Sequence, residues 1–489
     1  MCEVALEFEA EAQRALDTAS AKGAAYADVR FGSTRDEHVE VRNGVVAGLS
    51  DSESSGFSVR ALVDGAWGFA SSALIEAGEI DRVSTLAVDI ARASRAVQTQ
   101  RIELDLAGKF IASYATPVQI DPSTVSTGER VAYLLDVDKE MRAVSGVTVS
   151  RAWIDIWHTR KSFASTEGSR IEQQLVQCGS ALSALAVGAG DVQDRVHPGT
   201  GGLYQTGGYE VINDAKLLEN ARRVGEEAVA LLTADQSPSG TADLVLSGDQ
   251  MSLQIHESIG HALELDRVLG WEANFSGTSF ATLDKLNTFR YGSDIVTVVC
   301  DMTCPKALAT EGYDDEGTPA TSVDLIRDGI LVGYMAGRDT AAAAHVSCAG
   351  VVRAEYWGRL PMIRIGNVNL MPGTAASLDE LFDGIKQGIY MESNRSWSID
   401  DKRLNFQFGC QIGYEIKNGK RGRLLKNPTY AGMTPEFWAS CDAIGDQSTW
   451  VAWGTPNCGK GEPLQTARSC QASSPARFRN VKVGVGYGG

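Results

Sequence analysis

The chain has 489 residues, of which 43% are hydrophobic and 22% charged, and its formal net charge is −17. This length exceeds what one simple hydrophobic core supports, so we expect two or three domains. The acidic balance excludes nucleic-acid binding by general electrostatics, because phosphate contacts need a basic surface. The sequence has no run of about 18 apolar residues, so we expect no membrane span.

The N-terminal segment and the cysteines indicate a cellular compartment. Residues 1–9 are acidic and lack the apolar core of a signal peptide. The nine cysteines are an odd number and are sparse for a chain of this length. We therefore expect free thiols and a cytoplasmic protein.

Helices and short strands alternate in the first half of the chain. Helical spacing of apolar residues covers residues 4–22, about 71–97, about 127–145 and about 214–232. Strand patterns cover residues 27–31, 38–41, 56–63 and 147–157. Asn43-Gly44 and Asp64-Gly65 lie between alternating apolar residues, so they predict hairpin turns.

A polar stretch rich in Pro, Gly and Ser over residues 233–241 indicates the main domain boundary. We predict an N-terminal region over 1–235, with subdomains at about 1–110 and 111–235 as an open alternative, and a second domain over 236–489. Strand patterns dominate after residue 290, at 294–300, 330–335, 389–392, 413–417 and 481–486. The high glycine content, 51 residues, also favours a turn-rich and sheet-rich fold.

The segment His256-Glu257-Ser258-Ile259-Gly260-His261 has the clearest chemical meaning in the chain. It places two of only six histidines five positions apart, with a glutamate directly after the first. A hydrolytic zinc site needs neutral imidazole ligands and a carboxylate that stays off the metal to act on water. The competing interpretation is two ordinary polar histidines, because a motif alone is only a hypothesis.

The five-residue spacing of the two histidines does not fit a regular α-helix. On a regular α-helix, positions i and i+5 are about 140° apart, so His256 and His261 cannot share one ion from an undistorted helix. A π-bulge inserts one residue and brings the two positions together. Gly260 is well placed to tolerate that distortion. We therefore predict a locally widened helix within residues 252–263.

A zinc site needs at least a third protein ligand, and Cys458 is the candidate. It lies in the turn-rich segment 454–461, which has few apolar residues. The competing interpretation is a free cysteine that acts as a small hydrophobe. Cys300 and Cys304 follow an apolar strand pattern, so core packing explains them better.

Taken together, these segments resemble the TldD/PmbA family, specifically its metal-binding TldD-type branch. The resemblance covers nearly the whole chain. It rests on residues 23–30, 41–44 and 64–70 in the first region and on residues 256–261, 311–317, 414–420 and 457–460 in the second. It implies a fold of the α+β class, with an N-terminal α/β domain whose helices lie on antiparallel sheets and a β-rich catalytic domain that carries the metal-binding helix.

The resemblance also implies a site and an activity. His256, His261 and Cys458 would hold zinc, and Glu257 would be the general base. The implied activity is a metallopeptidase that cuts unfolded peptides, held as an added strand, or a peptide natural-product precursor. An amide hydrolase or N-deacetylase that acts on a small biosynthetic intermediate is the alternative.

A partner subunit is implied as well. It would be a metal-free TldE-like paralogue in a heterodimer, or a second copy of this chain in a homodimer. Because this chain has the metal motif, it resembles the catalytic subunit. The non-enzymatic alternative is that the chain is a scaffold subunit, which is inactive without its partner.

Two segments depart from the family pattern. Residues 393–403 are bulkier and more charged than the small residues expected there, and residues 341–348 are also unusual. These departures favour a specialised peptide or small-molecule substrate.

Overall fold

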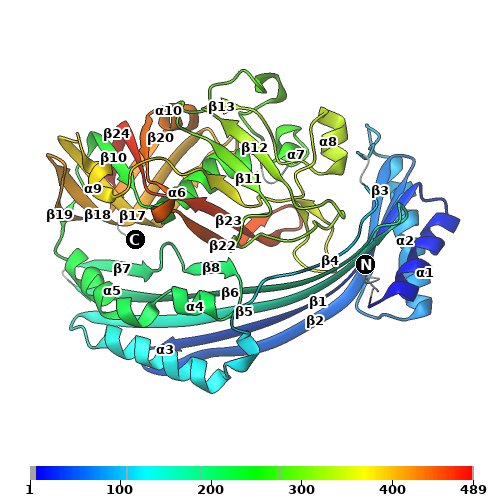
Figure 1. The fold of residues 1–489 in the computed structure, drawn as a ribbon, viewed down its shortest axis with the longest axis horizontal. Coiled ribbons are helices and arrows are strands. Elements are labelled where there is room, and N and C mark those ends of the chain that lie inside the picture. The colour runs from blue at the N-terminus through cyan, green and yellow to red at the C-terminus, as the bar shows by residue number, and fades with distance from the viewer. Residues whose placement is uncertain (1–6, 106–107, 189, 275–276, 487–489) are drawn as a thin grey trace.

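The computed structural model describes residues 7–105, 108–188, 190–274 and 277–486. A long curved sheet from the first half of the chain forms one side of the molecule, and a β-rich body from the second half rests on its concave side (Figure 1). The predicted α+β class is confirmed.

The first sheet has the strand order β3-β2-β1-β5-β6-β4, and β7 and β8 also pair with β6. Its pairings are antiparallel except for β4 with β6. Its strands are β1 (Tyr26–Arg42), β2 (Val45–Val63), β3 (Ala66–Ser72), β4 (Ile111–Ala115), β5 (Val147–Ser165), β6 (Arg170–Gly188), β7 (Asp191–His197) and β8 (Leu203–Thr206).

The strands of this sheet are longer than predicted. The separate strands predicted over 27–31 and 38–41 are parts of the single strand β1, which pairs with β2 on one side and β5 on the other. Residues 32–38 are mostly polar and show no alternation, so their strand conformation is held by backbone hydrogen bonds on both sides. The hairpin turn predicted at Asn43-Gly44 is confirmed, and both residues have positive φ angles of 49° and 82°.

Two pairs of helices pack on this sheet. The helices of the first half are α1 (Glu9–Ala21), α2 (Ala77–Arg95), α3 (Thr127–Arg142), α4 (Glu210–Asp214) and α5 (Leu217–Leu231). Apolar faces of α1 and α2 form one core with β1 and β2, whereas α3 and α5 form a second core with β5 and β6. The helix predicted over 4–22 is observed from Glu9, and residues 4–6 lie outside the described residues.

The second half contains another sheet, with the order β17-β10-β24-β20-β18-β19-β9 and β21 paired to β24. Its strands are β9 (Asp235–Gln236), β10 (Gly240–Leu246), β17 (Gln387–Ile399), β18 (Asn405–Lys417), β19 (Lys420–Lys426), β20 (Pro428–Met433), β21 (Cys441–Ile444) and β24 (Ala476–Val485). The chain therefore leaves the first sheet before residue 235, and the predicted domain limits themselves stay a prediction.

Smaller elements complete the second half. Its other strands are β11 (Val298–Asp301), β12 (Ser322–Arg327), β13 (Ile330–Leu331), β14 (Val352–Arg353), β15 (Met362–Ile363), β16 (Val368–Leu370), β22 (Val451–Lys460) and β23 (Gln465–Ser473). Its helices are α6 (Gly248–Ile255), α7 (Leu265–Val268), α8 (Arg338–Ala344), α9 (Leu378–Phe382) and α10 (Thr434–Ala439). The strands predicted over 294–300 and 330–335 are shorter than expected. A turn at residues 294–295 precedes β11, and β13 ends where the N–H groups of Val332 and Gly333 both donate to the carbonyl of Leu325.

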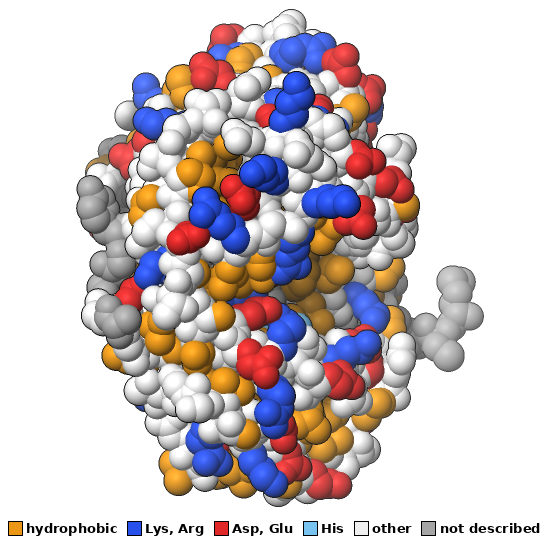
Figure 2. All heavy atoms as spheres, turned by 90° about the vertical axis from the view of Figure 1, so that its left-hand side faces the viewer, with side chains coloured by type: hydrophobic (Ala, Val, Ile, Leu, Met, Phe, Trp, Pro, Cys, Tyr) orange, Lys and Arg blue, Asp and Glu red, His pale blue; other side chains and the backbone are white. Residues whose placement is uncertain are grey.

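The surface shows no large region of one charge on the side that carries β19 and α5. There, acidic and basic side chains are interspersed, and apolar side chains gather in the hollow between the two halves (Figure 2). Among the described residues, no helix is both long enough and apolar enough to cross a membrane. The eight cysteines in the described ranges are all free thiols, as predicted.

Candidate metal centre

The two histidines of the motif lie on a widened helical turn. Helix α6 continues into a π-helical turn over His256–Gly260, and the backbone N–H of His261 donates to the carbonyl of His256, five residues earlier. The two imidazole centroids are 4.8 Å apart, with the rings at 85° to each other. The widened helix predicted from the spacing is confirmed.

Gly260 serves this turn in a different way from the one predicted. Its φ angle of −51° is ordinary for a helix, so the turn does not need the conformational freedom of glycine. A Cβ at this position would instead lie 3.0 Å from Cδ1 of Ile365. The missing side chain therefore allows close packing of the turn against Ile365.

Cys458 reaches the histidines from a distant part of the chain. Contrary to the predicted turn-rich loop, it lies on strand β22, just after an irregularity in the pairing with β23 between Thr455 and Cys458. Its Sγ is 3.6 Å from Nε2 of His261. One ligand atom from each of His256, His261 and Cys458 lies within 4.8 Å of the others.

The chemistry of these three donors fits a bound zinc ion. All three side chains are buried, with exposed fractions of 5%, 5% and 6%. Burial by itself would raise the pKa of the Cys458 thiol, but the two imidazoles lower that pKa well below its usual range, so the thiolate is favoured. Nδ1 of His256 is buried without a hydrogen-bond partner among the described residues. Two imidazoles and a thiolate are a donor set typical of zinc.

A buried carboxylate orients one of the imidazoles. Nδ1 of His261 donates a hydrogen bond to Oε2 of Glu264 over 2.8 Å. Burial alone would raise the pKa of Glu264, but Lys460 and then His261 lower it well below its usual value. Carboxylates in this position fix the tautomer and the ring orientation of metal-binding histidines.

Lys460 closes a buried charge network beneath the histidines. Its Nζ lies 3.2 Å from Glu264 and 2.8 Å from both carboxylate oxygens of Asp266, and its side chain is fully buried. Sequence reasoning gave no role to Glu264 or Lys460. Their closeness in sequence to the proposed ligands could have indicated a role. Glu264 follows His261 by three residues, and Lys460 follows Cys458 by two.

Glu257 follows His256 directly and its charge acts on that imidazole, but it is not one of the three clustered residues. It is 7% exposed, and its Oε2 accepts a hydrogen bond of 2.6 Å from Nη1 of Arg403. Nε of Arg403 is buried without a partner among the described residues. Burial lowers the pKa of Arg403, and the charge of Glu257 opposes that shift.

Arg403 comes from the hairpin tip between β17 and β18, within the segment that departs from the family pattern. Its φ angle of 61° lies in the left-handed region, which is uncommon for a residue other than glycine. Two hydrogen bonds hold it there: its N–H donates to the carbonyl of Asp400, and its carbonyl accepts from Oγ1 of Thr434. The sequence marked the segment as unusual but did not indicate that this arginine contacts Glu257.

Three family models match the chain. The one described as the PmbA/TldA metallopeptidase C-terminal domain matches residues 239–484. The models of domain 1 and of the central domain match residues 27–91 and 120–234.

Proteins similar to the whole chain are named as metalloproteases. A metalloprotease of Methanocaldococcus jannaschii is 30% identical over 86% of this chain and 89% of that protein. A metalloprotease TldD homolog of Haemophilus influenzae is 27% identical over 91% of this chain and 90% of that protein. A zinc metalloprotease TldD homolog of Saccharolobus solfataricus is 26% identical over 95% of this chain and 97% of that protein.

Solved structures share the fold. A Thermotoga maritima protein described as a modulator of a DNA gyrase superposes with a TM-score of 0.77 at 17% identity, over 98% of this chain and 100% of that chain. TldE from Thermococcus kodakarensis superposes with a TM-score of 0.72 at 15% identity, over 97% of this chain and 99% of that chain.

Proposed function

The chain belongs to the PmbA/TldD metallopeptidase family, and on that basis we propose that it is a zinc-dependent hydrolase that cleaves amide bonds. The observation that supports this proposal most strongly is the convergence of His256, His261 and Cys458 within 4.8 Å, with the charge of the adjacent Glu257 acting on His256.

The proposed ligands are His256, His261 and Cys458. When bound, zinc would polarise the substrate carbonyl and lower the pKa of water, which is the chemistry that amide hydrolysis needs. Glu264 keeps the imidazole of His261 in one tautomer through the bond to Nδ1. The network of Glu264 and Lys460 therefore pre-orders one ligand before any ion binds.

Glu257 is the proposed general base. Its carboxylate would accept a proton from the attacking water at Oε1 or Oε2 and return that proton to the leaving amine. The ion pair with Arg403 fixes the direction of the Glu257 carboxylate. Arg403 is therefore a positioning residue for the base.

An extended peptide is the substrate that the strand geometry favours. Strand β22, which carries Cys458, forms a ladder only with β23 among the described residues. Between Ala452, whose carbonyl accepts from Gln205, and Cys458, whose carbonyl accepts from Arg364, its other edge could accept an extended chain through backbone hydrogen bonds, with little selection of side chains. Such a peptide would pass next to Cys458.

A small-molecule amide is the alternative substrate. The observation that favours it is Arg403, a charged side chain placed beside Glu257 by the unusual segment 393–403. A cation at this position would select substrates more strongly than backbone pairing does. In that case the reaction is amide hydrolysis or N-deacetylation of a biosynthetic intermediate.

We also propose that the active form contains a second subunit, either a metal-free TldE-like paralogue or another copy of this chain. This proposal rests on the resemblance to the TldD-type branch; the likeness to TldE supports only a shared fold. Co-purification of the full chain from its host tests the partner. If the chain acts only as a scaffold, zinc will be absent from the purified complex.

The experiment that tests the function compares two substrates under defined metal content. The full chain, alone and with its co-purified partner, is stripped by a chelator, reloaded with zinc, and assayed on an unstructured peptide and on an N-acetylated small amine. We expect zinc-dependent cleavage, with the peptide cut faster. Absence of cleavage of both substrates by the zinc-loaded complex would refute the proposal.

A further inference from the structure

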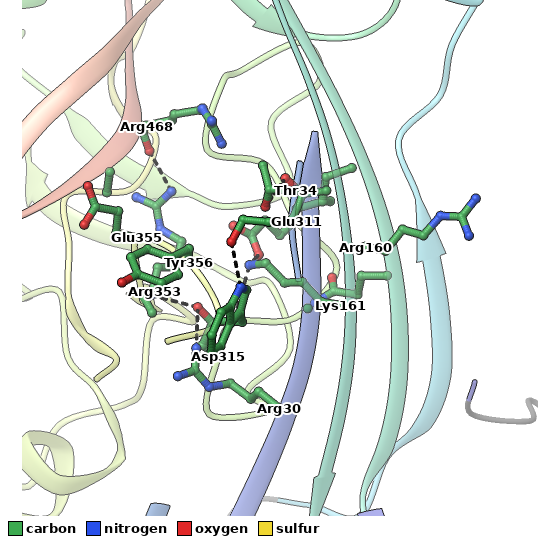
Figure 3. A pocket seen from close by; sticks show the side chains of 18 of the residues that line it. Arg30, Thr34, Arg160, Lys161, Glu311, Asp315, Arg353, Glu355, Tyr356 and Arg468 are labelled. Atoms are coloured by element: carbon green, nitrogen blue, oxygen red, sulfur yellow. Dashed lines mark hydrogen bonds and ion pairs between the residues drawn. The ribbon is translucent and has the colours of Figure 1, made fainter. Parts of the chain in front are cut away.

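A second candidate site lies between the long sheet and the C-terminal body. It is a cavity of about 500 Å³ whose walls come from β1, β5 and β6 on one side and from residues 311–315, 353–357 and 466–468 on the other (Figure 3). This volume is within the range of small-molecule pockets. None of the three proposed metal ligands lines it, and neither does Glu257.

Most of the buried acids in this cavity are already paired. Nζ of Lys161 lies 2.6 Å from Glu311 and 3.3 Å from Asp315, and Asp315 also lies 3.5 Å from Arg30. In Figure 3, these side chains form one group on the sheet side of the cavity. The acids and cations of this group compensate one another, so they leave little charge for a ligand to neutralise.

Arg353, on the opposite wall, forms no ion pair within the described ranges, although the charges of Glu311 and Asp315 act on it from a distance. It is only 4% exposed, and its two Nη atoms donate to the backbone carbonyls of Arg468 and Ile365, each over 2.6 Å. Its Nε has no hydrogen-bond partner among the described residues. A buried guanidinium bonded to neutral carbonyls retains its full positive charge, and an unpartnered buried donor is costly.

Arg468 adds a second positive charge next to the first. Its guanidinium stacks 4.3 Å above the ring of Trp157, and the nearest carboxylate in the described ranges, Asp36, is 4.0 Å away. Burial, with a smaller contribution from the charge of Arg353, lowers the pKa of Arg468 to about 10 against the opposing charges of Asp36 and Glu311. Burial also lowers the pKa of Arg353. An anion bound between the two arginines would offset the cost of burying each guanidinium charge.

The cavity is adjacent to the proposed metal ligands. Cys458 pairs directly with Ala467 across the β22–β23 ribbon, and Ala467 lines the cavity. Arg364, eleven residues after Arg353, donates to the backbone carbonyl of Cys458. The thiolate of Cys458 is also among the charges that act on Arg353. A molecule in the cavity would therefore lie close to the metal cluster without occupying it.

Aromatic side chains complete the wall. Tyr356 and Trp357 pack edge to face with their centroids 5.7 Å apart, and Nε1 of Trp357 donates to Oγ of Ser54 over 3.0 Å. Phe31 and Phe163 line the same space. Arg353 forms no ion pair among the described residues, and Arg468 has only the 4.0 Å contact with Asp36. These two cations beside an aromatic wall suit a ligand with one anionic group and an apolar body.

We propose that this cavity binds the carboxylate of an amide substrate, with Arg353 and Arg468 as the anion-binding residues. The substrate class is a short peptide with a free C-terminus or an N-acylated amino acid, both of which present the same carboxylate. The identity of the ligand as a substrate rests on the proposed function, whereas carboxylate binding itself does not.

Binding is tested with the full chain after zinc removal by a chelator, so that no turnover occurs. The probes in titration calorimetry are N-acetylphenylalanine, a peptide ending in phenylalanine, and the uncharged amides of both. We expect the acids to bind at least about tenfold more tightly than the amides, as for loss of one charge-assisted contact. If the chain binds the acid form and the amide form of a probe equally tightly, the proposal is overturned for the substrate class that this probe represents.

Arg468→Gln and Arg353→Met should each remove the preference for the acid. Arg353 is deeply buried, so its variant is interpreted only if its thermal unfolding matches that of the wild type, whereas the half-buried Arg468 provides the independent test. Arg160→Gln is the matched control, because Arg160 lies next to Lys161 on β5 and its guanidinium points away from the cavity (Figure 3). Retained acid preference in Arg468→Gln would overturn the proposal.

The two proposals fail separately. If the zinc-loaded chain hydrolyses amides without preferring acids, the carboxylate site is wrong and the proposed function stands. If the chelated chain prefers acids but the zinc-loaded complex hydrolyses neither, the carboxylate site stands and the proposed function is wrong.

Discussion

Nη1 of Arg403 lies 2.6 Å from Oε2 of Glu257, a residue 146 positions earlier in the chain. The contact joins the tip of the β17–β18 hairpin to the π-helical turn that carries the two histidines. It places a cation on the side chain proposed as the general base. The hairpin tip thus becomes part of the candidate site, although no residue of the tip belongs to the metal cluster.

Glu257→Gln tests the role of the base. The amide keeps the size and the hydrogen-bond acceptor of the side chain but cannot accept the proton, so we expect turnover to fall by about 100-fold or more while zinc content stays at the wild-type level. Zinc analysis and a hydrolysis assay on the same preparation measure both quantities. Full activity of this variant would remove Glu257 from the mechanism.

Arg403→Ala tests the positioning of the base. Loss of the ion pair leaves Glu257 misdirected, so we expect kcat to fall about tenfold or more with little change in KM and with zinc retained. Arg403→Lys should recover part of kcat, because it restores the charge without the planar guanidinium. Lys402→Ala is the control, since Lys402 is the exposed neighbour on the same hairpin tip. Equal kcat in the Ala, Lys and wild-type proteins would contradict the role.

Glu264→Gln tests the orientation of His261. We expect zinc affinity to fall by about 10- to 100-fold, the usual effect of losing a carboxylate that orients a histidine ligand. Competition with a chromophoric chelator measures the affinity. Asp266→Asn is the control, because Asp266 contacts Lys460 but makes no hydrogen bond to His261. A similar loss of affinity in both variants would mean that the buried network acts on stability alone.

Gly260→Ala tests the close packing of the π-helical turn. The added Cβ would lie 3.0 Å from Cδ1 of Ile365, so we expect the free energy of unfolding to fall by about 1 kcal/mol or more. Ile365→Val removes Cδ1, so the cost of the double variant should be less than the sum of the two single costs. Gly78→Ala is the control, because an added Cβ at Gly78 in α2 meets nothing within 4 Å. Strict additivity of the Gly260 and Ile365 variants in chemical denaturation would exclude this contact.

The fold could be predicted best where the pattern is local. Asn43-Gly44 predicted its turn because such pairs adopt positive φ angles at low cost, and the spacing of His256 and His261 predicted the π-helical turn because only that geometry aligns them. The length of β1 could not be predicted, because its polar middle is held by partners far away in sequence.

The candidate site could be predicted only in part for the same reason. The motif residues and Cys458 were identified from residue type and family resemblance, and the structure brings them together. Arg403 and Arg353 were not, because an arginine in a loop or a short strand gives no local sign of the group that it will face. Their roles depend on contacts between segments more than one hundred residues apart.

The central claim is that His256, His261 and Cys458 hold zinc, and X-ray absorption at the zinc edge of the purified complex tests it most directly. The account predicts a first shell with one sulfur at about 2.3 Å and nitrogen or oxygen neighbours at about 2.0–2.1 Å. In the Cys458→Ser variant the sulfur should disappear from the shell. A wild-type zinc shell without sulfur would contradict the account.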